Sequence, residues 1–146
     1  VRKKQVELVS FVLMPNHFHI LLKNISQHSV SSYMQRVLSS YGKYFNRKYG
    51  KTGHVFGSPY RGALVENNKN LLLTSVFIHK NPLSIPDWSH RYDEYPFSSY
   101  PDYLKNSRWG KLLCTETILR QFKNASGYKD FVDTHPKKEE DLMLDF

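Results

Sequence analysis

Two short alternating segments near the N-terminus constrain the fold most strongly. Residues 6–13 alternate between the two faces of an extended chain and are rich in β-branched and aromatic side chains, and residues 17–22 alternate again. Between them, Met14-Pro15-Asn16 supplies turn chemistry, because proline fixes φ and asparagine tolerates positive φ. The pattern predicts a β-hairpin.

The second strand of this hairpin carries two histidines two positions apart. A period of two places His17 and His19 on one face together with Leu21, opposite Phe18 and Ile20. Two imidazoles on one face can bind a single divalent cation. The pattern by itself also suits two surface histidines, so both interpretations stay open at this point.

A long amphipathic helix is predicted after the hairpin. Apolar residues recur at the i, i+3, i+4, i+7 spacing from Val30 to Phe45, and Tyr41 and Tyr44 belong to this stripe. Ser29 is the predicted N-cap and Gly50 the predicted residue just beyond the C-terminus. The opposite face is polar and basic.

The remaining elements follow from caps, breakers and aromatic content. We expect a strand over residues 60–66, a helix over 71–80 that is capped by 67–70 and stopped by Pro82, and a third helix over 116–123. Residues 84–103 contain five Tyr or Trp and Phe97, which predicts an ordered arm packed on the core. The elements indicate an α+β fold, with a solvated end at residues 136–141.

Charge is distributed unevenly along the 146 residues. The net charge is +8, and no Asp or Glu occurs between Leu8 and Val65. Ten Tyr and nine Phe accompany the basic residues, as in proteins that bind single-stranded nucleic acid. A merely solvated basic face is the alternative. The candidates for contact with a nucleic-acid backbone are Arg36, Lys43, Arg47, Lys51, His54 and Arg61, although His54 could equally be structural.

Composition also bears on the compartment. The single cysteine, Cys114, cannot form an intramolecular disulfide, which favours a reducing environment. No apolar run approaches the roughly 20 residues that a membrane-spanning helix needs. We therefore expect a cytoplasmic protein without a membrane partner.

The hairpin sequence resembles that of a known enzyme family. Residues 13–22, Leu-Met-Pro-Asn-His-Phe-His-Ile-Leu-Leu, are similar to the metal-binding hairpin of the HUH endonucleases, specifically the Y1 transposases of the IS200-like and REP-associated tyrosine transposase type. Further similar motifs follow in the same order, and the resemblance covers roughly residues 5–105. They are residues 41–46, 53–56, 60–61, 78–82 and 98–100.

The resemblance implies a fold and a domain organisation. It implies a ferredoxin-like sheet packed by helices, an α/β sandwich, whose first strand and helix precede this hairpin in the family and are absent here. Residues 1–105 would form the HUH domain and residues 106–146 a C-terminal helical extension and tail. A longer product, or a partner chain in a homodimer, would then supply the missing strand.

The resemblance also implies a reaction. In the family, two strand histidines and a polar side chain from a helix hold Mg²⁺ or Mn²⁺, and a helix tyrosine attacks a phosphodiester in single-stranded or hairpin DNA. The products are a 5′-phosphotyrosine link and a free 3′-OH. By motif, His17 and His19 match the histidines, and Asn81 matches the third ligand.

The position of the nucleophile departs from the family pattern. Phe77 stands where the family has tyrosine, four residues before Asn81, which implies either a natural degenerate or a Tyr-to-Phe variant. Tyr60 or Tyr100 could be imagined as a substitute nucleophile, but neither lies one helical turn from a predicted metal ligand. His79 competes as a ligand, but on a helix it lies about 200° around from Phe77, and Asn81 only about 40°. Pro82 argues against helical backbone at Asn81.

Three functions remain open from the sequence. The first is a transposase or single-strand nickase domain, in active or inactivated form. The second is a binding protein that recognises a DNA hairpin without cutting it. The third is a ferredoxin-like RNA-binding domain in which His17 and His19 bind nothing.

Overall fold

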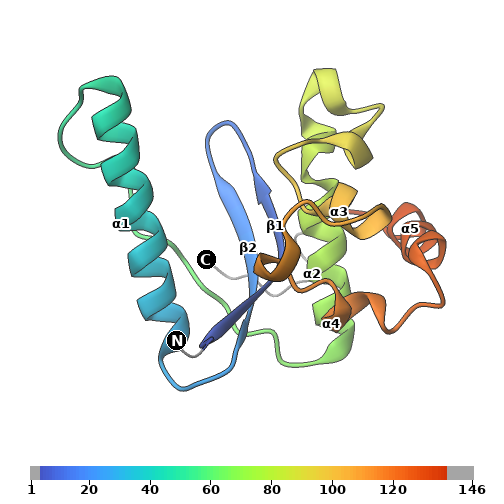
Figure 1. The fold of residues 1–146 in the computed structure, drawn as a ribbon. Coiled ribbons are helices and arrows are strands. Elements are labelled where there is room, and N and C mark those ends of the chain that lie inside the picture. Colours follow the sequence, from blue (N-terminus) through green and yellow to red (C-terminus); the bar gives the residue numbers. More distant parts are fainter. Residues whose placement is uncertain (1–3, 138–146) are drawn as a thin grey trace. The chain divides into compact units, whose positions relative to one another are not determined.

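The computed structural model describes residues 4–137 and shows the expected α+β fold (Figure 1). The chain divides into two compact units. We call residues 4–6 and 24–63 the α1 unit, and residues 7–23 and 64–137 the hairpin unit. The elements are β1 (Val6–Leu13), β2 (Phe18–Asn24), α1 (Ser29–Tyr49), α2 (Asn68–Lys80), η1 (Asn81–Ser84), η2 (Pro86–Trp88), η3 (Tyr92–Glu94), α3 (Tyr100–Leu104), η4 (Gly110–Leu112), α4 (Glu116–Leu119) and α5 (Ala125–Thr134).

The predicted hairpin is confirmed. Strands β1 and β2 pair in a two-stranded antiparallel sheet, and the turn is closed where the Met14 N–H donates to the His17 carbonyl at 2.8 Å. Later segments pair with the other edge of β1, through bridges at Leu8–Leu113 and Val12–Ser98. These contacts satisfy backbone groups that an open strand edge would leave unpaired.

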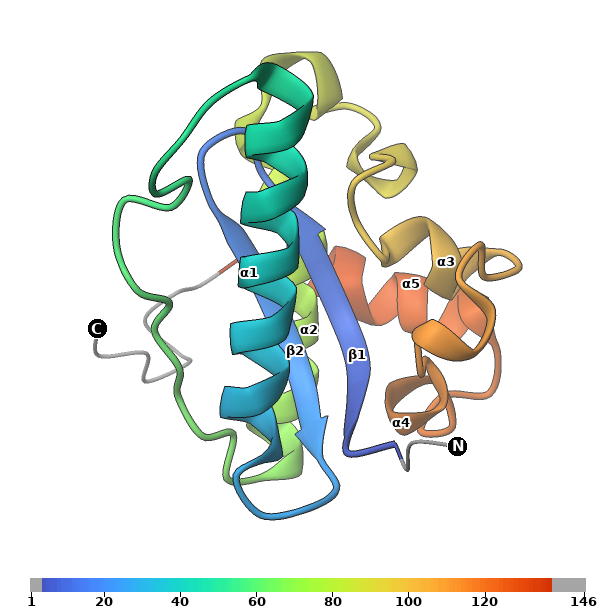
Figure 2. The same ribbon diagram turned by 60° about the vertical axis from the view of Figure 1, so that its left-hand side comes forward.

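Helix α2 forms the centre of the hairpin unit. It runs along one face of the β1–β2 hairpin (Figure 2), and residues 75–81 are all buried. The predicted cap is confirmed, since the Asn67 side chain accepts from the Asn70 N–H at 2.9 Å. The expectation that Pro82 keeps Asn81 out of the helical region is wrong. Asn81 has φ −53° and ψ −42°, because the chain tightens directly into η1, where a proline at the first turn displaces no hydrogen bond.

A buried polar network joins α2 to its neighbours. The Nδ1 of His79 shares a 2.6 Å hydrogen bond with the Tyr128 hydroxyl of α5, and its Nε2 shares one of 2.8 Å with Ser99 Oγ. Ser99 Oγ in turn accepts from the Phe11 N–H of β1 at 2.9 Å. The ring of His79 stacks on Tyr100 at 4.9 Å. Burial lowers the pKa of His79 to about 3, so the imidazole is neutral near physiological pH.

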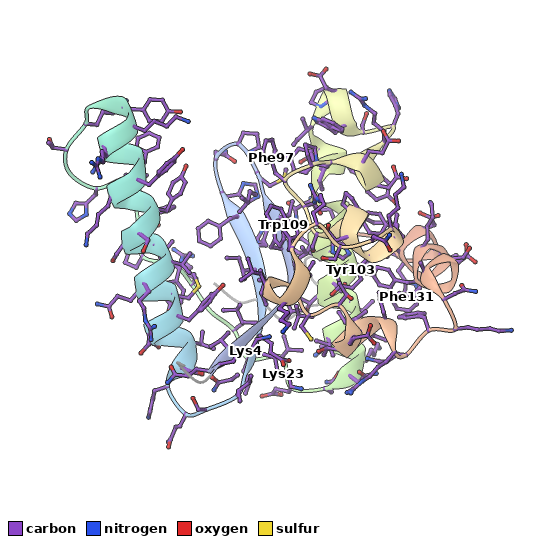
Figure 3. The ribbon with its side chains drawn as sticks, in the orientation of Figure 1. Lys4, Lys23, Phe97, Tyr103, Trp109 and Phe131 are labelled. Carbon is purple, nitrogen blue, oxygen red and sulfur yellow. The ribbon has the colours of Figure 1, made fainter. Side chains whose placement is uncertain are left out.

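The aromatic arm over residues 84–103 is ordered, as predicted. Tyr95, Tyr100 and Tyr103 are buried, and Tyr103 lies among the helices that cover α2 (Figure 3). Phe97 does not pack on the core as the other aromatic residues of the arm do, and its side chain is exposed. Its carbonyl accepts from the Leu13 N–H, and the alternation that turns Ser98 inward directs Phe97 outward.

The C-terminal helices differ from the prediction. The helix expected over 116–123 ends at Leu119, and α5 was not predicted. Asn124 explains the break, since its side chain caps α5 by accepting from the Gly127 N–H at 2.9 Å. Helices α3 and α5 pack against each other, and Phe131 lies on α5 (Figure 3).

A charged clamp fastens the segment that follows the aromatic arm. The buried carboxylate of Asp102 accepts from the backbone N–H and Nε of Arg108, both at 2.9 Å, and from its terminal nitrogen at 2.8 Å. The Trp109 indole donates to the same carboxylate at 3.0 Å. Burial alone would raise the pKa of Asp102, but the hydrogen bonds from Arg108 and Trp109 hold that pKa below its ordinary value. Arg108 also donates to the Pro96 and Ser98 carbonyls, and thereby ties this loop to the part that pairs with β1.

In the α1 unit, one predicted cap is correct and the other is wrong. Gly50 ends α1 with φ 59°, a conformation that suits glycine, and its N–H donates to the Asn46 carbonyl. At the other end, His28 precedes the helix with φ 60° and Ser29 is already helical. The Ser29 hydroxyl instead donates backwards to the Ser26 carbonyl at 2.7 Å, so it cannot cap the next turn.

Residues 60–66 form no strand, which corrects the prediction. Gly62 offers no side chain to pack, and among residues 4–137 only β1 and β2 form a sheet, so this segment has no strand to pair with. The solvated end predicted at 136–141 falls outside the described residues from 138 onward. In the described part of the chain, no helix has the length and apolarity needed to cross a bilayer.

Candidate functional site

Three of the predicted site residues meet in the hairpin unit. His17 and His19 lie at the tip of the hairpin with ring centroids 5.2 Å apart and ring planes at 79°. The ring of His19 also meets that of Phe77 edge-on, with 5.0 Å between centroids. The strand period directs both imidazoles the same way, and α2 brings Phe77 to the same point. The structure thus joins residues that are far apart in the sequence.

The His17 ring is oriented by its neighbour Asn16. Its Nδ1 lies 2.7 Å from the Oδ1 of Asn16, and an amide oxygen can only accept a hydrogen bond. With Nδ1 engaged by Asn16, Nε2 is the ring nitrogen left to face a metal ion. His17 is exposed and His19 half-buried, so solvent reaches the tip of the hairpin. A hydrogen bond that orients a ligating imidazole in this way is common at metal sites.

The spacing of the two imidazoles fits one shared cation. A metal bound at about 2.1 Å from a ring nitrogen lies a little over 3 Å from the ring centroid. Two such rings at roughly a right angle or a tetrahedral angle about the ion have centroids about 4.5–5.5 Å apart. The observed 5.2 Å lies in this range.

Asn81 lies one helical turn beyond Phe77 and is buried. Its amide nitrogen donates to the Phe77 carbonyl at 3.1 Å, so the amide oxygen is the atom that could serve as a ligand. Among residues 4–137, no group of three or more His, Cys, Asp or Glu side chains is arranged to hold a metal ion. Asn81 belongs to the same unit as the histidine pair.

The surroundings of Phe77 include two further residues that the sequence offered as site candidates, His79 and Tyr100. The Phe77 side chain is only 3% exposed, and the Lys137 ammonium lies 5.5 Å from its ring centroid. Sequence reasoning missed Lys137, because no motif marks it.

His79 uses both ring nitrogens in the core network, which removes it as a metal ligand. Tyr100 is also buried, and its ring stacks on that of His79 within the core network.

The six predicted DNA-contacting residues all belong to the α1 unit and all are exposed. The two ion pairs found between residues 4 and 137 join Arg108 to Asp102 and Lys129 to Asp133, so neither neutralises any of the six. The loop after α1 is held where the Asn46 amide donates to the Gly53 carbonyl at 2.9 Å. The six are Arg36, Lys43, Arg47, Lys51, His54 and Arg61.

A groove in the same unit was not predicted. It has a volume of about 1080 Å³, and its lining includes Lys4, Tyr33, Arg36 and Ser40. The i, i+3 spacing of Tyr33 and Arg36 places them on one helix face, which is the sequence signal that could have revealed it. The cations in its lining are Lys4 and Arg36, and the α1 residues of the lining lie between Ser29 and Ser40.

Comparison with known proteins identifies the family of the chain. The model of the family described as transposase IS200-like matches residues 1–81, more than half of the chain. The match includes the histidine pair of the hairpin and ends at Asn81 of the α2–η1 junction. No curated protein and no solved structure matches the chain. The chain therefore belongs to the IS200-like transposase family, a family of DNA transposition and recombination.

Proposed function

We propose that this protein binds single-stranded or hairpin DNA at a divalent-metal site made by His17, His19 and Asn81, with Phe77 in the position of the nucleophile. The observation that carries the proposal is the contact of three rings, at 5.2 Å between the histidines and 5.0 Å from His19 to Phe77. The family generally uses a divalent metal and acts on DNA. Phosphate oxygens as co-ligands favour Mg²⁺ or Mn²⁺ over softer ions.

Each residue has a distinct task in this proposal. His17 offers Nε2, because its Nδ1 is hydrogen-bonded to Asn16. Asn81 offers its amide oxygen, because its nitrogen is committed to the Phe77 carbonyl. A bound divalent cation supplies charge that polarises the scissile phosphate and stabilises its transition state.

Phe77 sets the outcome of binding. A phenyl ring has no oxygen to attack phosphorus, so the chain as it stands holds DNA without forming a phosphotyrosine link. The ring is edge-on to His19, which is where a tyrosine nucleophile would have to lie to reach a phosphate beside the histidines. We therefore infer that this chain binds DNA with the fold and site of a nuclease but does not cut it.

The metal site is tested by calorimetric titration of Mn²⁺ into the wild-type protein and His17→Ala. We expect the variant to lose most of its affinity, because one of three protein ligands is removed. His90→Ala is the matched control, since His90 is also an exposed histidine of the hairpin unit. Equal Mn²⁺ binding by wild type and His17→Ala would contradict the proposed site.

The nucleophile position is tested with Phe77→Tyr. The Phe77 ring lies 5.0 Å from the His19 ring and 5.5 Å from the Lys137 ammonium, so the added hydroxyl enters polar surroundings and the fold should tolerate it. With Mn²⁺ and a hairpin-bearing single strand, we expect nicking and a DNA-linked protein band on a denaturing gel. Phe77→Leu is the control and should give no band. A Phe77→Tyr protein that binds metal and DNA yet never forms the adduct would show that position 77 is not the nucleophile position.

The RNA-binding alternative predicts a different result. An RNA-binding domain would bind an RNA hairpin at least as tightly as a DNA hairpin of the same sequence, and Mn²⁺ would not change the affinity. We expect the DNA hairpin to bind more tightly, and His17→Ala to abolish the metal-dependent part of its affinity. Competition titrations with both hairpins, with and without Mn²⁺, separate the two functions.

A further inference from the structure

A row of exposed aromatic rings covers the second half of α1. Amphipathic spacing predicts that Tyr41 and Tyr44 are buried, but they are 47% and 59% exposed, and Tyr49 beyond them is 55% exposed. The partly buried rings of Phe45 and Phe56 join them. We call these five residues the ring ladder, and all of them belong to the α1 unit.

The ring ladder is a continuous surface. Tyr41 lies at its centre, with ring centroids 6.5 Å from Tyr44, 6.2 Å from Phe45 and 5.9 Å from Phe56. Phe45 continues it to Tyr49 at 4.7 Å. Mutual contact limits the rotation of each ring, so the ladder offers flat faces at low entropic cost.

Cations are built into the same surface. The Lys48 ammonium lies 5.7 Å from the ring centroid of Tyr44 and 5.5 Å from that of Tyr49, and the Lys51 ammonium lies 5.9 Å from that of Phe45. No acid occurs anywhere in the α1 unit between residues 24 and 63. A partner of this surface must therefore combine flat apolar faces with negative charge.

We infer that the ring ladder is a stacking surface for unpaired nucleotides of single-stranded DNA, with Lys48 and Lys51 contacting the phosphates between the stacked bases. Aromatic rings interleaved with cations are how proteins bind single strands without reading their sequence. The inference rests on the proposed function only in taking DNA as the ligand. It adds a second contact surface, made of residues that the metal site does not use.

The length of the surface suits a short stretch of strand. Tyr41 and Tyr49 are eight residues apart on one helix, which is about 12 Å along its axis. Stacked nucleotides advance about 3.4 Å each, so three or four bases would cover the ladder. A base-paired duplex offers no free base faces to this surface.

The test compares two sets of substitutions in the full chain. Tyr41, Tyr44 and Tyr49 are replaced together by Leu, which removes the rings, or together by Phe, which keeps them. Binding of a fluorescent oligothymidylate is measured in EDTA, together with binding of an abasic strand of equal length and charge. Circular dichroism checks that both variants are folded, and Tyr44→Leu alone provides a milder variant at the most exposed ring.

We expect the Leu set to weaken oligothymidylate binding about tenfold or more, and Tyr44→Leu several-fold, because each stacked base contributes appreciably to affinity. The Phe set should bind like the wild type, and all variants should bind the abasic strand equally. Unchanged oligothymidylate binding by the Leu set would overturn the inference, as would an equal loss on the abasic strand. A change in sedimentation of the Leu set would overturn it too, and would assign the rings to contact between copies of the chain.

This experiment is independent of the metal site. Because it is done in EDTA and without a hairpin, His17→Ala should bind oligothymidylate like the wild type. A failure of Mn²⁺ binding would refute the proposed metal site and leave the stacking result standing. A failure of stacking would leave the metal result standing.

Discussion

Replacing Asp102 by Asn should destabilise the hairpin unit strongly, although the two side chains have nearly the same shape. Oδ1 would still accept from the backbone N–H and Nε of Arg108. At the position of Oδ2, an NH₂ group would face the Arg108 terminal nitrogen and the Trp109 indole, both of which are donors. The substitution therefore removes two charge-assisted hydrogen bonds and sets a donor against two donors.

The size of the effect follows from these contacts. A hydrogen bond to a charged group contributes about 1.5–3 kcal/mol, and two are lost. The Arg108 side chain is 40% exposed, so water replaces part of its share. We expect the free energy of unfolding to fall by about 3 kcal/mol. For a chain of this length, the midpoint of thermal unfolding should fall by roughly 6–12 °C.

Urea unfolding followed by circular dichroism measures this difference, and Asp133→Asn is the matched control. Asp133 also accepts two side-chain hydrogen bonds, from Lys129 and Tyr92, but its side chain is 43% exposed. The control should lose less than about 1 kcal/mol. If the two variants unfold at the same urea concentration, burial does not make the Asp102 clamp strong and the reasoning is wrong.

Three further predictions concern pH, a helix end and the basic face. The pKa of Asp102 in the folded protein lies below the ordinary 3.8. The stabilisation by its carboxylate is therefore complete above pH 3.8 and is lost as the pH falls through the folded pKa. The free energy of unfolding should fall less steeply with decreasing pH in Asp102→Asn than in the wild type. Gly50→Ala should cost about 1 kcal/mol in urea unfolding, because φ is 59° although no atom lies within 4 Å of the added methyl group, and Gly50→Asn should cost less. Replacing Lys43 and Arg47 by Gln should weaken DNA binding and lower the slope of log affinity against log salt by about two, whereas Lys129→Gln, whose ammonium is paired, should not.

The elements that could be predicted from the sequence are those specified by residues close together in the chain. The hairpin and the start of α2 depend on neighbours in sequence, a Pro-Asn turn in one case and the Asn67 cap in the other. The meeting of His19 with Phe77 was expected from family resemblance, because no periodicity links a strand to a helix so far away in the chain.

The features that could not be predicted from the sequence depend on packing between residues far apart in the chain. An amphipathic stripe indicates which residues share a face of α1, but it does not say whether anything covers that face, and Tyr44 is exposed. Residues 60–66 have strand composition, but strand formation also needs a partner to pair with. Lys137 reaches Phe77 only through the path of the chain after α5, to which no motif corresponds.

The hydrogen bonds of His79 have a consequence for protein engineering. The part of the chain that matches the family ends at residue 81, yet both partners of this imidazole, Ser99 and Tyr128, lie beyond it. A chimera that transplants residues 1–81 onto another C-terminal half would carry a buried ring with two unsatisfied nitrogens. Its designer would have to graft Ser99 and Tyr128 as well, or replace His79 by an apolar residue of similar volume.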